Sequence, residues 1–99
     1  MALPKSMEEF KGTLSEGAPP KDWPKPLQAL WWDAQDNWEA AHDLVDGSTA
    51  PMADAVHAYL HRKEGDEWNA NYWYENAKRA FFDGSLEAEW EVLVKELLG

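Results

Sequence analysis

Two histidines and a glutamate stand at helical spacing in the segment HAYLHRKEGD, residues 57–66. His57 and His61 are four positions apart and Glu64 follows three positions later, so a helix would place all three on one side. Two imidazoles one turn apart can bind the same metal ion, and a carboxylate can serve as a third ligand. His42 is the only other histidine and would have to supply any further imidazole. One prediction is therefore a metal site or small-ligand site, compatible with an enzyme, made of His57, His61 and Glu64.

The residues around these histidines favour a second interpretation. The segment between them is Ala-Tyr-Leu, so the glutamate that acts as general base in helix-borne zinc metalloproteases is missing. Histidines also pack between helices, where a ring nitrogen donates to a carboxylate such as Asp33, Asp43 or Glu64. His42 follows two alanines, which is typical of close helix packing. We favour histidines that line a seam between helices, and a ligand-contacting role of the same side is a third interpretation.

Seven tryptophans in 99 residues indicate a dense core or a recognition surface. Trp73 is the middle of three consecutive aromatic residues, which cannot all face one way on a helix. We predict that Tyr74 is in the core, which leaves Trp73 either packed on Phe81–Phe82 or exposed as an anchor for a partner. Trp32 follows Trp31, which fits the core, and we predict that Trp32 is exposed or contacts the N-terminal segment.

Composition excludes several classes of function. The net charge is −10, and the only basic clusters are the pairs Arg62-Lys63 and Lys78-Arg79. Nucleic acids and anionic membranes are bound by basic surfaces, so we expect neither as a partner. The chain has no cysteine, which excludes thiol catalysis and cysteine-based metal sites.

The absence of known catalytic and cofactor-binding motifs from the sequence narrows the possible functions further. The sequence contains no phosphate-binding glycine loop and no serine nucleophile motif, so we predict no cofactor and favour a protein that is not an enzyme. No apolar run is long enough to cross a membrane, and the N-terminus MALPKSMEEF has no signal-peptide core. We therefore expect a cytoplasmic location.

Helix signals follow one another along the chain and no segment alternates like a strand, so we predict an all-α fold. About six helices are expected, at roughly 7–16, 27–35, 37–46, 50–64, 67–79 and 86–98. Gly47 and Gly65 are predicted to end the helices before them. The predicted N-terminal caps are Ser6, Asp36, Ser48 with Thr49, Asp66 and Ser85.

These helices are predicted to form one domain over residues 1–99. Residues 1–20 hold the N-terminal helix and the start of a proline-rich linker, and residues 26–80 form two antiparallel hairpins. Residues 85–98 form an amphipathic helix that caps the stack.

The two hairpins are visible as an internal repeat. The segment LWWDAQDNWEAAHDL, residues 30–44, matches the segment LHRKEGDEWNANYWY, residues 60–74, when Leu30 is placed on Leu60. This alignment pairs Asp36 with Asp66 and Trp38 with Trp68. Repeats of this length are typical of helical hairpins that stack and bury their faces against one another.

The segment GDEWNANYWYENA, residues 65–77, resembles the tetratricopeptide repeat in its glycine–aspartate turn and in its alanines Ala70 and Ala77 around Tyr74. It departs from that repeat in its shorter period and in the placement of Trp68 one position late. Nearly the whole chain also resembles a group of small bacterial proteins that share the blocks LQALWWDAQDNWEAAHDL, HAYLHRKEGDEWNANYWY and SLEAEWE. This resemblance implies a helical fold and a bacterial cytoplasmic setting, and it supplies no catalytic residue.

Our first functional prediction is a non-enzymatic scaffold that binds a protein or peptide. Stacked hairpins leave one surface free for partners. The candidate surface residues are His57, His61, Glu64, Trp73 and Trp32. The alternative is the metal-binding or ligand-binding protein described above.

Overall fold

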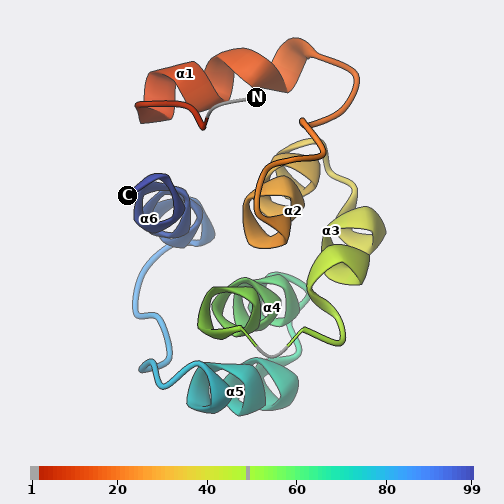
Figure 1. The fold of residues 1–99 in the computed structure, drawn as a ribbon. Helices are drawn as coiled ribbons and strands as arrows, with labels where there is room; N and C mark the ends of the chain where they lie inside the picture. Colours follow the sequence, from red (N-terminus) through yellow and green to blue (C-terminus); the bar gives the residue numbers. More distant parts are fainter. Residues whose placement is uncertain (1–2, 49) are drawn as a thin grey trace.

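The computed structural model describes residues 3–48 and 50–99, and within these ranges the chain is helical and contains no strand. The elements are α1 (Met7–Gly12), the 3₁₀-helix η1 (Thr13–Ser15), α2 (Lys25–Ala34), α3 (Trp38–Val45), α4 (Pro51–Lys63), α5 (Glu67–Asn76) and α6 (Leu86–Leu98) (Figure 1). The predicted all-α fold with about six helices is confirmed. None of the described helices is long and apolar enough to cross a membrane.

The helices are arranged as two hairpins and two covering helices. Helix α2 packs against α3, α4 packs against α5, and α3 contacts α4 to join the hairpins. Helix α1 lies at one end of the molecule and α5 at the other (Figure 1). Helix α6 covers the stack from the side, where it contacts α1, α2 and α4.

Aromatic side chains attach the N-terminal segment to this stack. Phe10 of α1 is fully buried and stacks on Trp23 of the linker at 5.7 Å between ring centroids. Its ring also lies 5.7 Å from that of Trp90 on α6, whose indole nitrogen donates to the carbonyl of Leu30 at 3.0 Å. The short α1 is therefore held by tertiary packing, since an isolated helix of this length is unstable in water.

Three of the predicted caps are found at the predicted place. The hydroxyls of Ser6 and Ser85 and the carboxylate of Asp66 each accept from the backbone amide three positions later. The predicted cap Ser48 is wrong, because Ala50 is the N-cap of α4 and makes no side-chain cap hydrogen bond. The hydroxyl of Ser48 accepts only from the amide of Ala50 itself, at 3.4 Å, and Thr49 lies outside the described residues. The predicted cap Asp36 is wrong, because Asn37 is the N-cap of α3 and its side chain accepts from the amide of Ala40.

Asp36 does not cap α3 because of the backbone conformation of the turn before that helix. Asp36 has a left-handed conformation with a φ of +60°, and Gly65 has the same role in the second hairpin with a φ of +85°. In the first turn the amides of residues 36 and 37 donate to the carbonyls of residues 33 and 32. In the second turn the amides of residues 65 and 66 donate to those of residues 62 and 61. Asp36 is therefore equivalent to Gly65, and the predicted pairing of Asp36 with Asp66 is wrong by one position.

Helix α5 ends earlier than the sequence predicted. Lys78 has a left-handed φ of +59°, and the amide of Arg79 donates to the carbonyl of Tyr74 to close the helix. The side chain of Arg79, which lies after the end of α5, forms two hydrogen bonds with Glu96 on α6, at 2.6 and 3.0 Å. The turn thereby directs the chain toward α6.

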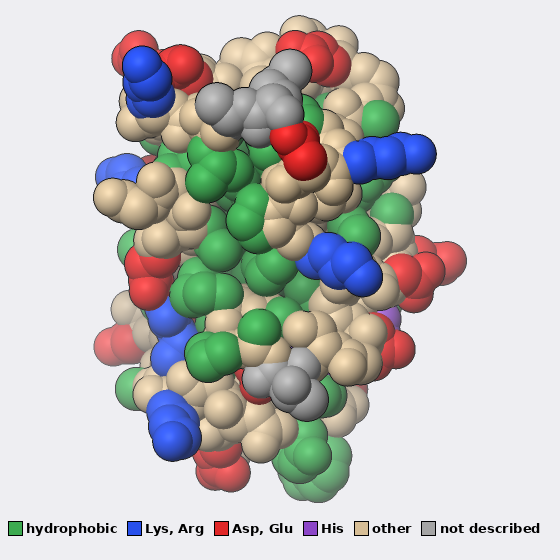
Figure 2. Space-filling model, viewed as in Figure 1, with side chains coloured by type: hydrophobic (Ala, Val, Ile, Leu, Met, Phe, Trp, Pro, Cys, Tyr) green, Lys and Arg blue, Asp and Glu red, His purple; other side chains and the backbone are tan. Residues whose placement is uncertain are grey.

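Both residues of the basic pair Arg62-Lys63 form ion pairs with buried carboxylates. Lys63 binds the buried Asp33 of α2 at 2.8 Å, and Arg62 binds the buried Glu89 of α6 at 2.9 Å. On the face drawn in Figure 2, hydrophobic side chains gather along the middle and again at the lower end, where α5 lies. Histidine is visible on this face only at the right edge, beside α3 (Figure 2).

Candidate metal centre

The three histidines of the chain come together where the two hairpins meet. His42 lies on α3, and His57 and His61 lie one turn apart on α4. The ring centroids are 4.7 Å apart for His42 and His57, 5.3 Å for His42 and His61, and 4.9 Å for His57 and His61. Each ring offers one nitrogen, and these three nitrogens lie within 4.8 Å of one another.

Two tryptophans frame this cluster. Trp38 lies one turn before His42 on α3 and stacks on its ring at 4.7 Å and 11°. Its indole nitrogen donates to the carbonyl of Leu60 at 2.8 Å, which ties α3 to α4 at this point. On the other side Trp73 of α5 stacks on His57 at 4.0 Å and 12°. The rings of the cluster are therefore held by packing as well as by the helices.

His57 is the most buried member of the cluster, with 1% of its surface exposed. Its Nδ1 atom has no hydrogen-bond partner within the described part of the chain. Burial lowers the pKa of His57 to about 4, the charges of His42 and His61 add to this effect, and Asp46 opposes it. The ring is therefore neutral at neutral pH, which is the form that binds a metal ion.

Glu64 contacts only one of the histidines. Its carboxylate lies 2.6 Å from Nδ1 of His61. A carboxylate at Nδ1 fixes the orientation of an imidazole, leaves Nε2 free and makes that nitrogen a stronger ligand. The position of Glu64 is therefore that of a residue that orients a ligand.

A second group of possible ligands lies beside the first. It consists of His61, Glu64 and Asp66, which are more exposed than the three histidines. Both carboxylate oxygens of Asp66 already accept hydrogen bonds from Asn69, at 3.2 and 2.6 Å, because Asp66 caps α5. This group therefore has less free ligand capacity than the histidine cluster.

The sequence prediction and this geometry overlap in part. His57 and His61 do share one side of α4, and they do line the seam between the hairpins. The third imidazole comes from His42, whereas Glu64 is paired with His61 alone. Asp33, one of the predicted histidine partners, instead accepts from Tyr59 at 2.6 Å and binds Lys63.

The predicted surface tryptophans are both half-buried. Trp73 is enclosed between His57 and Tyr72, and Trp32 makes an edge-to-face contact with Trp31 at 5.0 Å. It is Trp31 that reaches the N-terminal segment, with a hydrogen bond from its indole nitrogen to the carbonyl of Thr13 at 3.2 Å.

Sequence reasoning missed the most exposed aromatic pair. Trp68 is 77% exposed and Tyr72 is 50% exposed, and their rings stack at 6.4 Å on α5. The predicted alignment of the repeats paired Trp68 with the half-buried Trp38 and hid this difference. In the alignment that the turns define, Trp38 corresponds to Glu67, so Trp68 has no packed counterpart.

No protein-family model matches the sequence, no curated protein is significantly similar to it, and no solved structure matches its fold. The resemblance to small bacterial proteins stays a prediction. The case for a function therefore depends on the geometry of this chain.

Proposed function

We propose that this chain binds a divalent transition-metal ion through His42, His57 and His61. The observation that carries the proposal is the meeting of three imidazoles from two helices, one of them with a buried nitrogen that lacks a partner among the described residues. A buried polar atom without a hydrogen bond is costly, and a metal ligand bond would satisfy it. The Glu64–His61 contact supports the same proposal, because ligand histidines commonly carry a carboxylate on their second nitrogen.

The ligand chemistry favours zinc, nickel or copper. Neutral imidazole suits these ions, and three histidines leave a fourth position for water or another ligand. Nitrogens bound to one tetrahedral zinc ion lie roughly 3.3 Å apart, so small side-chain rotations would draw these rings together. When bound in such a site, zinc can bring the pKa of a water molecule close to neutrality.

The test is a zinc titration of protein stripped of metal, followed by calorimetry. We expect one zinc ion per chain, and at least a tenfold loss of affinity in each of the variants His42→Gln, His57→Gln and His61→Gln. Circular dichroism checks that each variant keeps its helices.

The matched control separates the two possible ligand groups. Asp66→Asn removes a carboxylate from the second group but keeps a good helix cap, so zinc affinity should stay within about twofold. The proposal is overturned if zinc does not bind stoichiometrically. It is also overturned if affinity depends on Asp66 and not on His42.

A second candidate function is the binding of a protein or peptide by α5. The exposed stacked pair Trp68 and Tyr72 favours it, because exposed aromatic residues are enriched at binding hot spots. We expect Trp68→Ala to leave the melting temperature unchanged and to abolish capture of a partner by the immobilised chain. Val92→Ala is the control, because Val92 is also exposed but lies on α6. Equal capture by both variants would contradict the role of α5.

A further inference from the structure

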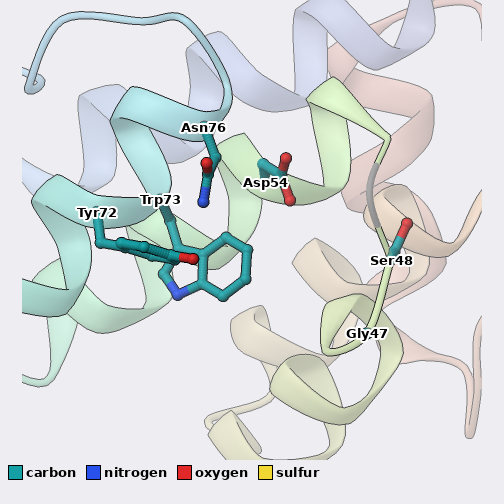
Figure 3. Close-up of a pocket in the computed structure, with 6 residues that line it drawn as sticks. All are labelled: Gly47, Ser48, Asp54, Tyr72, Trp73 and Asn76. Atoms are coloured by element: carbon teal, nitrogen blue, oxygen red, sulfur yellow. The ribbon is translucent and has the colours of Figure 1, made fainter.

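A pocket of about 470 Å³ opens beside the histidine cluster. Tyr72, Trp73 and Asn76 of α5 form one wall, Asp54 comes from α4, and Gly47 and Ser48 lie opposite (Figure 3). Its size is within the range of pockets that bind small molecules. None of the described residues that line it is basic.

Asp54 is the unexplained group in this pocket. The residue is 5% exposed, its Oδ1 atom has no hydrogen-bond partner in residues 3–48 and 50–99, and no ion pair to it is found there. Burial raises the pKa of Asp54, which reflects the cost of a charge without a counter-ion. The N-terminal end of α4 favours a negative charge nearby, but it gives Oδ1 no hydrogen bond. A cationic ligand in the pocket would supply the missing counter-ion.

The aromatic wall suits a cation as well. The rings of Tyr72 and Trp73 meet at 89° with centroids 5.0 Å apart. His57 covers one face of Trp73, and both Tyr72 and Trp73 line the pocket. Aromatic faces attract ammonium groups, and pairs of rings set at an angle are the usual walls of sites that bind methylated ammonium.

We infer that this pocket binds a small organic cation, a methylated ammonium ion that is balanced by the Asp54 carboxylate and packed on Tyr72 and Trp73. Ser48 and Asn76 are the polar groups available for a hydroxyl or carbonyl on the same ligand. A bare metal cation fits this pocket less well, because Asp54 is the only carboxylate among the described residues that line it. The inference does not depend on metal binding by the histidines.

Choline is the first probe, and 3,3-dimethylbutan-1-ol is its neutral control of the same shape. The titrations are followed by NMR line shifts of the full chain in the presence of EDTA, so that the result is independent of metal. We expect saturable binding of choline and at least tenfold weaker binding of the neutral alcohol. Tetramethylammonium should bind in the same place, with shifts at Trp73.

Two pairs of variants complete the test. Asp54→Asn keeps the shape of the side chain but removes its charge, and should weaken choline binding at least tenfold. The exposed Asp83→Asn is the matched control and should have no effect. If Asp54→Asn does not fold, Tyr72→Leu and Tyr72→Phe replace it, and only the first should lose affinity.

Three results would overturn the inference. They are the absence of saturable choline binding at millimolar concentration, equal affinity for choline and for the neutral alcohol, and unchanged choline affinity in both Asp54→Asn and Tyr72→Leu.

Discussion

At the scale of single residues, His57 combines the features that make a side chain sensitive to its surroundings. It is buried, its ring is stacked between Trp73 and His61, and one of its nitrogens has no partner among the described residues. A neutral imidazole is tolerated in such a place, whereas a charged one is not. The stability of the fold and the binding of metal should therefore both respond to this ring and to its neighbour His61.

The first prediction concerns stability and pH. The pKa of His57 falls from 6.5 to about 4 on folding, so between these values the unfolded chain binds a proton that the folded chain does not. The contribution of the neutral His57 ring to the free energy of unfolding is fully present above pH 6.5 and is lost as the pH falls to about 4. The total loss is up to about 3 kcal/mol. Urea unfolding of metal-free protein at several pH values measures this loss, and His57→Gln should reduce it.

The comparison with His57→Gln is needed because other groups also make the stability depend on pH. His42, His61 and Asp46 all act on His57. Burial raises the pKa of Glu89 and of Asp54, so these acids favour the folded state as the pH falls, in both proteins alike. Identical pH curves for the two proteins would show that His57 is not the source.

The second prediction concerns Glu64. If its carboxylate orients His61, Glu64→Gln should weaken zinc binding by about 10- to 100-fold without abolishing it. Calorimetry with the stripped protein measures the change. Glu67→Gln, an exposed change in the first turn of α5, is the control. Complete loss of zinc binding in Glu64→Gln would instead show that the Glu64 carboxylate is itself a metal ligand.

At the scale of elements, the two short turns determine the register of the paired helices that they join. Each turn contains one left-handed residue, Asp36 in the first hairpin and Gly65 in the second. Only glycine adopts this conformation without strain, although aspartate tolerates it better than most residues do. The turns therefore differ in strain although their hydrogen bonds are equivalent.

The third prediction follows from this difference. Asp36→Gly should stabilise the protein by about 0.5–1 kcal/mol, and Gly65→Ala should destabilise it by about 1 kcal/mol. Thermal and urea unfolding measure both. Gly17→Ala is the control, since Gly17 has no left-handed φ and has open space around it, and it should be neutral or slightly stabilising. A loss of stability in Asp36→Gly would contradict the argument.

At the scale of the whole molecule, buried ion pairs join elements that are far apart in sequence. Glu89 of α6 is 2% exposed, and it accepts from Arg62 of α4 at 2.9 Å and from Tyr74 of α5 at 2.5 Å. Arg62 also donates to the carbonyl of Gly84 in the segment before α6. One carboxylate thus connects the second hairpin to the C-terminal helix.

The fourth prediction tests this connection. Arg62→Met should cost about 3–5 kcal/mol, because it leaves the Glu89 charge buried without its cation. In the Glu89→Gln background the same substitution should cost less, since no charge is left behind. A double-mutant cycle by urea unfolding measures the difference. Additive effects would show that the pair is not coupled.

The sequence by itself determined the local structure of this protein. The serine and aspartate caps, the glycine stop at Gly65 and the helical pattern act over a short stretch of chain, so they could be read directly from it. The same local signals misplaced the cap at Asp36, because the choice between Asp36 and Asn37 depends on which residue becomes left-handed.

Only the tertiary structure decided which side chains meet. His42 joins His57 and His61, Glu89 receives Arg62 and Tyr74, and Asp54 is enclosed beside Trp73. Each of these meetings depends on how the hairpins and α6 pack, and that packing is the sum of many weak contacts between distant residues. The helix pattern predicts that a side chain faces inward, but it cannot name the residue that this side chain contacts.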